Sequence, residues 1–119
     1  MFRKLLRAKL HGGTVTGADL HYEGSIAIDT DLLTAAQIAP FESVHVWNVT
    51  NGQRFETYAI PSPAGSGELL VNGAAAHRAK RGDTIIVASF GWFPEDEVAS
   101  HRPTIVLLDA NNRPKPRTD

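Results

Sequence analysis

The stretch VHVWNVT at residues 44–50, followed by NG at 51–52 and QRFETYAI at 53–60, carries the clearest structural signal in the chain. β-Branched and aromatic residues alternate with polar ones on both sides of the Asn-Gly pair, as they do in half-buried strands. Asn and Gly both accept a positive φ, so the pair predicts a two-residue turn. The stretch therefore predicts an antiparallel β-hairpin that spans residues 44–60.

Further strands are expected on both sides of this hairpin. The apolar run TIIVASF at residues 84–90 is typical of a strand buried on both faces, and shorter runs at 69–71 and 104–109 predict two more. Residues 21–29 predict a turn followed by a short strand. The first residues fit a helix or a strand, and the Gly12-Gly13 pair favours two strands joined by a tight turn.

Short helical segments complete the pattern, and they are expected at residues 31–37, 74–79 and 94–97. Asp29 or Thr30 can cap the first of these. The polar, Pro-containing end at residues 110–119 is expected to be frayed. About six or seven short strands with small helices predict a single mainly-β domain over residues 1–119, closed or nearly closed into a barrel.

The composition of the 119 residues, 42% hydrophobic and 21% charged, is typical of a soluble globular domain. A formal net charge of −1 supplies no field that would hold nucleic acid or an anionic membrane. No apolar run approaches the roughly 20 residues of a membrane helix. The basic N-terminus is not followed by a long apolar stretch, so it is not expected to be a secretory signal. We therefore expect a cytoplasmic protein that binds neither nucleic acid nor a membrane. A domain this small would gain stability by forming an oligomer.

Several kinds of chemistry are missing from the sequence. The chain has no cysteine, which excludes disulfides, thiolate nucleophiles and Cys-ligated zinc. Its five histidines lack metal-binding spacing, so no metal is expected; they are His11, His21, His45, His77 and His101. No Gly-rich loop opens a helix, so a phosphate-bearing cofactor is not expected either.

The segment ADLHYEGS at residues 18–25 contains a Gly-Ser pair that can support self-cleavage. The Ser25 hydroxyl can attack the carbonyl of Gly24, whose missing Cβ leaves that carbonyl open, and the amide becomes an ester. β-Elimination then leaves a dehydroalanine, and its hydrolysis yields a pyruvoyl group. A Gly-Ser pair in a turn is common, and residues 65–66 contain another, so this hypothesis depends on the neighbouring sequence.

Three blocks of sequence together resemble the pyruvoyl-dependent aspartate 1-decarboxylases, in the order and register of that family. The blocks are Lys9 and His11 with ADLHYEGS at 18–25, WNVTNGQRFETY at 47–58, and VNGAAAH at 71–77. The resemblance extends from the N-terminus to about Asp109. Gly82-Asp83 before a buried strand is similar to the turn of double-psi β barrels, the fold of this family. The resemblance therefore implies a double-psi β barrel with small helices.

The resemblance also implies an activity, the decarboxylation of L-aspartate to β-alanine and CO₂ (EC 4.1.1.11) in pantothenate and coenzyme A synthesis. Autocatalytic cleavage would give chains of residues 1–24 and 25–119. A pyruvoyl group derived from Ser25 would form a Schiff base with the substrate amine and act as the electron sink, in place of pyridoxal phosphate or a metal. The family further implies a homotetramer with active sites between neighbouring subunits.

The same resemblance assigns roles to individual residues. Tyr58 would donate the proton that the carbanion takes up, and the Thr57 hydroxyl would assist cleavage between Gly24 and Ser25. Arg54 would clamp a substrate carboxylate in its guanidinium fork. The implied substrate-binding set is Lys9, Arg54, Thr57, Asn72, Gly73, Ala74 and Ala75. The residues expected to line or orient the site are His11, His21, Tyr22 and Trp47.

Strand geometry sets a condition on this site. Arg54 and Tyr58 are four residues apart and share a strand face, whereas Thr57 points to the other face. Either a bulge or a pocket completed by another subunit would reconcile their roles. Ile26 and Arg78 depart from the family pattern, and Arg78 is expected to affect subunit contacts rather than the chemistry.

Other functions remain as alternatives to this activity. One is a β-barrel binding module that never processes itself, and another is a nucleic-acid-binding barrel that uses the basic N-terminus. A pyruvoyl enzyme acting on another amino acid is a third.

Overall fold

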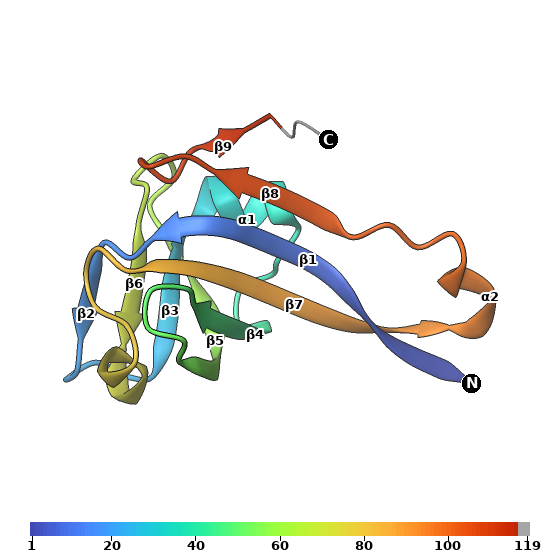
Figure 1. Cartoon of the computed structure of the whole chain (residues 1–119), viewed down its shortest axis with the longest axis horizontal. Coiled ribbons are helices and arrows are strands. Elements are labelled where there is room, and N and C mark those ends of the chain that lie inside the picture. The colour runs from blue at the N-terminus through green and yellow to red at the C-terminus, as the bar shows by residue number, and fades with distance from the viewer. Residues whose placement is uncertain (117–119) are drawn as a thin grey trace.

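The computed structural model describes residues 1–116 and confirms the mainly-β class. Figure 1 shows a strongly curled sheet with short helices beside it and at the end of a long arm. The strands follow the order β2-β6-β3-β5-β4-β7-β1-β8-β9, and the curl is consistent with a small β barrel. The elements are β1 (Phe2–Thr14), β2 (Gly17–Asp19), β3 (Ser25–Asp29), α1 (Thr30–Ala36), β4 (Ser43–Asn48), β5 (Arg54–Ser62), β6 (Leu69–Asn72), η1 (Gly73–His77), β7 (Thr84–Pro94), α2 (Glu95–Val98), β8 (Thr104–Leu108) and β9 (Pro114–Lys115).

β4 and β5 form the predicted antiparallel hairpin, but the prediction of a two-residue turn is wrong. The strands stop at Asn48 and resume at Arg54, and within the Asn-Gly pair only Gly52 has a positive φ, 77°. The Asn48 side chain explains the wider loop, because its Oδ1 accepts the backbone N–H of Thr50 at 3.0 Å. This side-chain cap replaces the hydrogen bonds of a tight turn.

β1 is one strand instead of the two that the sequence favoured. It continues through the Gly12-Gly13 pair, where the register shifts between His11 and Gly13, so a bulge stands in place of the predicted turn. The reason is long-range pairing: β1 is antiparallel to β7 along its length and parallel to β8 over residues 8–11. The pairing with β7 resumes at Gly13 and Thr14, so β7 holds the strand together across the bulge.

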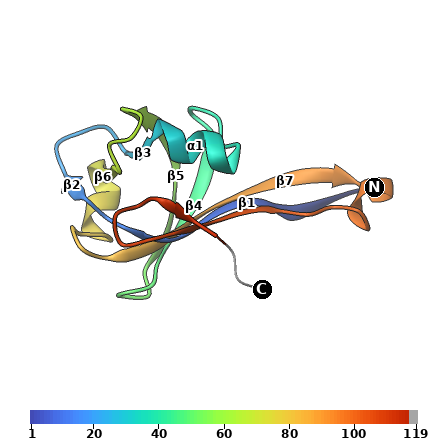
Figure 2. The same ribbon diagram turned by 90° about the horizontal axis from the view of Figure 1, so that it is seen from above.

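The first half of β1 and the last half of β7 leave the body as an arm that ends at α2 (Figure 2). The arm is paired from Phe2 opposite Pro94 to Leu6 opposite Phe90. Phe2 is 64% exposed and Trp92 is 69% exposed. The arm therefore presents large apolar side chains that this chain does not cover.

β7 differs from the strand buried on both faces that its apolar run predicts. Its core-facing side chains Ile85 and Val87 are buried, whereas Ile86 and Phe90 are only half-buried. The strand also extends to Pro94, beyond the predicted end at residue 90. Ala88 lies on the same face as Ile86 and is buried, so the second face of this strand is covered at its middle and only partly covered on either side.

The helices confirm the sequence predictions, and the end of the chain does not. Asp29 caps α1 through a hydrogen bond from the Asp31 N–H at 2.8 Å, and η1 and α2 form where helical turns were expected. The prediction of a frayed end is wrong as far as β9, because Asn112 is buried and its side chain donates a hydrogen bond to Thr14 O at 2.9 Å. Residues 117–119 of that prediction lie outside the described residues. No helix within residues 1–116 is long and apolar enough to span a membrane.

The core lies between the curled sheet and α1. It is built from aliphatic side chains of both, namely Leu10, Val15, Ile26, Ile28, Leu32, Leu33, Val44, Val46, Leu69, Val71, Ile85 and Val87. Burial of such side chains contributes about 1.5–3 kcal/mol each. This packing fixes β3, β5 and β6 side by side, and these three strands carry the candidate site.

Candidate active site

Ser25 begins β3 and is buried, with 1% of its surface exposed. β3 is antiparallel to β6, and the register sets Ser25 opposite Asn72. Asn72 Nδ2 donates to Ser25 Oγ at 3.2 Å, and that hydroxyl donates to Glu23 O at 3.3 Å. The serine oxygen is therefore held by an amide and turned back along the chain toward Glu23.

Asn72 and Gly73 form the corner at which β6 passes into η1. Asn72 is 2% exposed, and its Oδ1 has no hydrogen-bond partner in the described part of the chain. Gly73 is buried, Ala75 is half-buried and Ala74 is exposed. A buried oxygen without a donor costs about 1–3 kcal/mol, so Asn72 Oδ1 marks a place for a further donor beside Ser25.

The register of β5 divides its side chains between two faces. Arg54, Glu56 and Tyr58 pair with residues of β4 and share the outer face of the sheet. Thr57 pairs with the buried Val44 and lies on the core face. The pairing of this hairpin runs without a register shift, so the bulge considered from the sequence is absent here and Thr57 and Tyr58 lie on opposite faces.

Tyr58 lies on the strand next to Ser25. β3 and β5 are parallel, and their pairing begins at Ile26 opposite Ala59. The preceding residues, Ser25 and Tyr58, are therefore neighbours where this pairing begins. Adjacent strands are about 4.8 Å apart. Tyr58 is half-buried, and its ring lies 6.3 Å from that of Phe41. The predicted proton donor is thus one strand away from the predicted pyruvoyl position.

Arg54 lies farther along the outer face, with its guanidinium carbon 5.2 Å from the centroid of the Trp47 ring. A pocket of about 320 Å³ contains both, and its other lining residues are Lys4, His45 and Phe90. Two cations against an aromatic wall suit a small carboxylate. Sequence reasoning gave no role to Lys4, His45 or Phe90. The strand period could have found His45, which lies two residues before Trp47 on the same face.

Lys9 and His11 lie on the outer face of β1. Lys9 is opposite Ala88, which is in turn opposite His45, so the lysine shares the face of the Arg54 pocket. Three strand spacings, roughly 14 Å, separate the backbones of β1 and β5. Partial desolvation lowers the pKa of His11, and the charges of Lys9 and Lys115 lower it further, so its surroundings favour the neutral imidazole.

His21 and Tyr22 lie in the loop before β3, and both are exposed. With Glu23 they line an open pocket of about 360 Å³. The Asp19 carboxylate accepts the backbone N–H of His21 at 3.0 Å. The structure thus sets these two residues beside the Gly24-Ser25 pair and apart from the Arg54 pocket.

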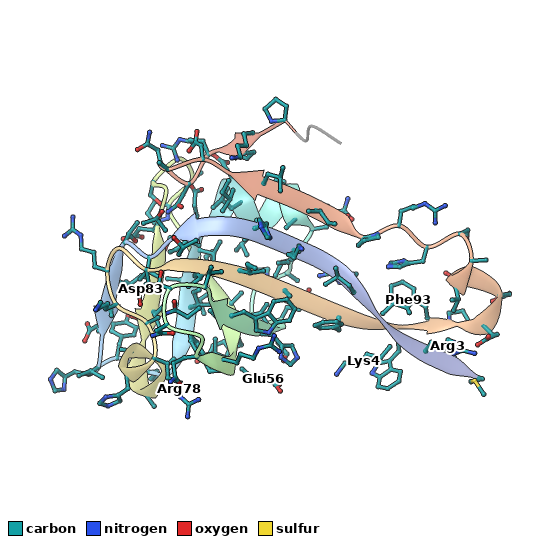
Figure 3. All side chains as sticks on the ribbon, viewed as in Figure 1. Arg3, Lys4, Glu56, Arg78, Asp83 and Phe93 are labelled. Carbon is teal, nitrogen blue, oxygen red and sulfur yellow. The ribbon has the colours of Figure 1, made fainter. Side chains whose placement is uncertain are left out.

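Arg78 links the two parts of the candidate site, a contact that the sequence did not predict. Its Nη1 donates to Arg54 O at 3.0 Å, and its own carbonyl accepts Asn48 Nδ2 at 2.9 Å. Figure 3 shows Arg78 on the side of the molecule where Glu56 of β5 also lies. Because Arg78 directly follows η1, it ties the β6–η1 corner to the hairpin.

A buried carboxylate supports the same region. Asn48 Nδ2 also donates to Asp83 Oδ2 at 2.8 Å, and the backbone N–H of Lys80 donates to the same oxygen at 3.0 Å. These two hydrogen bonds, that of Asn48 first, lower the pKa of Asp83 although burial opposes its ionisation. The charged Asp83 thus anchors the loop between η1 and β7 to the end of β4.

Among the described residues, no group of three or more His, Asp or Glu side chains is arranged to hold a metal ion. The ionisable groups that line the Arg54 pocket are Lys4, His45 and Arg54, and Tyr58 lies on the same face of β5 as Arg54. The arrangement combines a buried hydroxyl directly after a glycine with a separate pocket lined by two cations.

Comparison with known proteins matches residues 1–115 to the aspartate decarboxylase family. An aspartate 1-decarboxylase of Bordetella avium is 55% identical over 115 residues, which are 97% of this chain and 94% of the relative. "Aspartate 1-decarboxylase 2" of Polaromonas sp. is 54% identical over 113 residues, 95% of this chain and 90% of the relative. The enzyme of Syntrophobacter fumaroxidans is 53% identical over 114 residues, 96% and 92% of the two chains.

Proposed function

Because the chain belongs to the aspartate decarboxylase family and is an aspartate 1-decarboxylase of pantothenate biosynthesis, we propose that it works with a pyruvoyl group made from its own Ser25. The observation that carries this proposal is the environment of Ser25, buried and hydrogen-bonded to Asn72 directly after Gly24. Gly24 is exposed, and a Cβ built on it would meet nothing within 4 Å, so the chain leaves room on that side of the residue. A nucleophile fixed next to an accessible carbonyl is the geometry that self-cleavage requires.

The proposed cleavage uses only the chain and one water molecule. Ser25 Oγ bonds to the Gly24 carbonyl carbon, the C–N bond to Ser25 breaks, and the hydroxyl proton moves to that nitrogen. Loss of the Ser25 Cα proton then breaks the Cβ–Oγ bond, with the Gly24 carboxylate as leaving group. Water replaces the nitrogen, which leaves as ammonia. The products are chains of residues 1–24 and 25–119.

The residues around Ser25 fit such a group. When formed, the pyruvoyl carbonyl supplies the electron sink for decarboxylation. Asn72 holds a hydrogen-bonding amide at this position, and Tyr58 lies one strand away to return a proton to the substrate carbon. Thr57 precedes Tyr58 and lies on the core face of β5, and its hydroxyl is the group proposed to support the oxyanion of the first step.

L-Aspartate has two carboxylates, and the proposed binding groups for them are Arg54 and Lys9. Their strands are roughly 14 Å apart in one chain, and Arg54 lies away from Ser25 along the sheet. We therefore propose a homotetramer in which neighbouring subunits complete each site. The uncovered apolar side chains of the arm supply a surface for such contacts. The absence of cysteine and the near-neutral charge fit a cytoplasmic enzyme.

Reductive trapping with aspartate tests the pyruvoyl proposal. Purified protein is incubated with ¹⁴C-aspartate and cyanoborohydride, and β-alanine formation is measured in a parallel sample without reductant. We expect label on the chain of residues 25–119 and β-alanine in the parallel sample, with neither from Ser25→Ala. Equal β-alanine formation by wild type and Ser25→Ala would contradict the proposal.

A further inference from the structure

Gly73 packs directly against the segment that is proposed to be cut. A Cβ built on Gly73 would lie 2.6 Å from Gly24 N, 2.7 Å from Gly24 Cα and 2.8 Å from Tyr22 O. Side-chain carbons essentially never approach other atoms this closely. All three neighbours are backbone atoms, so none can rotate away as the end of a side chain could. The β6–η1 corner and residues 22–24 therefore fit together only when position 73 has no side chain.

The backbone conformation of Gly73 is a separate reason for glycine, and the chain allows the two reasons to be distinguished. Its φ is 68°, in the left-handed region. Gly82 has a φ of 93°, and a Cβ there would meet nothing within 4 Å. A side chain at position 82 thus carries the conformational cost without the contact.

The β3–β6 register connects this contact to the reacting atoms. Asn72 lies opposite Ser25 and donates to its Oγ at 3.2 Å, and the next residue of β6, Gly73, lies against Gly24. The corner therefore touches both sides of the bond to be broken. Displacement of Gly24 by about 1 Å would separate its carbonyl from Oγ, and misplacement of that size costs on the order of 100-fold in rate.

We propose that Gly73 is a positioning residue for self-cleavage, in addition to the substrate contact that the family resemblance implies. Because it lacks a side chain, the β6–η1 corner can press on residues 22–24 and hold the Gly24 carbonyl at Ser25 Oγ. The step it supports is the first one: the Oγ–C bond forms, the C–N bond breaks and the hydroxyl proton moves to the Ser25 nitrogen. This inference rests on the proposed function, since it has meaning only if the chain cleaves itself.

The test follows cleavage itself, in the absence of aspartate. Newly purified full-length wild type, Gly73→Ala, Gly73→Asn and Gly82→Ala are incubated, and the uncut fraction is measured over time by mass spectrometry under denaturing conditions. We expect Gly82→Ala to cleave at the wild-type rate and Gly73→Ala to cleave about 100-fold more slowly. Gly73→Asn should also be slow, because Asn tolerates a left-handed backbone but retains the Cβ.

The same substitutions are made in a Ser25→Ala background, which keeps the chain uncut, and their thermal unfolding is compared. We expect cooperative unfolding in every case. Cleavage of Gly73→Ala within twofold of the wild-type rate would overturn the inference. Slow cleavage of Gly73→Ala together with wild-type cleavage of Gly73→Asn would also overturn it, because that result would assign the effect to backbone strain. Failure of both Gly73 variants to fold would likewise overturn it, in favour of a general role in the fold. If wild type does not cleave, the proposed function fails instead.

Discussion

On the outer face of β5, the residue proposed to bind substrate is separate from the residue proposed to transfer a proton. Arg54 lies against Trp47 in the 320 Å³ pocket, whereas Tyr58 lies beside the start of β3, where Ser25 is buried. The two side chains share a face and are four residues apart on one strand. Changes at the two positions should therefore alter different kinetic constants.

Removal of the Tyr58 hydroxyl should slow turnover without affecting cleavage. In Tyr58→Phe the ring and its packing against Phe41 are retained, and only the hydroxyl, the proposed proton donor, is lost. We expect kcat to fall by about 100-fold or more, with KM within about threefold of wild type. Steady-state β-alanine formation by protein that mass spectrometry shows to be fully cut measures this. An unchanged kcat would assign the proton to another group.

Replacement of the Arg54 guanidinium should weaken substrate binding. Arg54→Lys keeps the charge but loses the two-pronged carboxylate contact and the planar stack on Trp47. We expect KM for aspartate to rise about tenfold or more, with a smaller change in kcat. Arg81→Lys, at an exposed position in the loop before β7, is the control and should behave as wild type. Equal KM values for the two variants would remove Arg54 from the substrate site.

At the scale of elements, Asp29 joins β3 and α1 to the loop before β6. Its carboxylate accepts the N–H groups of Asp31, Gly65 and Gly67 at 2.8, 3.0 and 2.8 Å, and Arg113 lies 3.5 Å away. Burial opposes ionisation of this carboxyl, but the hydrogen bonds, that of Gly67 first, outweigh it and lower its pKa. The charged form therefore stabilises the native fold.

Asp29→Ala should lower the free energy of unfolding by about 2–3 kcal/mol at pH 7, since a cap and a charged acceptor are lost. Because the folded pKa is below the unfolded value of about 3.9, this stabilisation is complete above that value and is lost as pH falls through the folded pKa. Urea unfolding from pH 7 to pH 2 should show the wild-type advantage shrinking below about pH 4. The exposed Asp31→Ala is the control; an advantage that stays constant to pH 2 would contradict this account.

Elements defined by local signals could be predicted from the sequence, and those defined by distant partners could not. The hairpin and the Asp29-capped helix depend on neighbours in the chain, and both form as expected. β1 crosses its glycine pair because β7 pairs with it before and after the glycines, and β9 forms because Asn112 reaches Thr14. Periodicity carries no information on such pairings.

The candidate site divides in the same way. Spacing alone predicted that Arg54 and Tyr58 share a strand face, and the register agrees. The hydrogen bond between Ser25 and Asn72 joins residues 47 positions apart, and the contact of Gly73 with Gly24 is of the same kind. The link from Arg78 to Arg54 also depends on how η1 docks on the hairpin. These contacts required the folded chain.

On the scale of the whole molecule, the arm makes the chain long, with extents of 44 × 29 × 26 Å. Near the tip of the arm only β1 and β7 pair with each other, and Phe2 and Trp92 are largely exposed there. An isolated two-stranded ribbon is marginally stable in water. The arm is therefore the surface at which we expect neighbouring subunits to meet.

A charge on the arm should weaken the proposed tetramer. Trp92→Glu would bury a carboxylate in the subunit contact, and we expect a lower mass in size-exclusion chromatography with light scattering. The decarboxylation rate per chain should fall with it if sites lie between subunits. Val49→Glu, at another exposed apolar position in the β4–β5 loop, is the control. A Trp92→Glu protein that keeps both the wild-type mass and rate would contradict the proposed role of the arm.

The mass of the purified wild-type protein under denaturing conditions tests the central claim most directly. The account predicts two species, residues 1–24 and residues 25–119, the second lighter by one ammonia than a chain that begins with serine. A Ser25→Ala protein should give one species of residues 1–119. A single uncut wild-type chain that nevertheless converts aspartate to β-alanine would contradict the account.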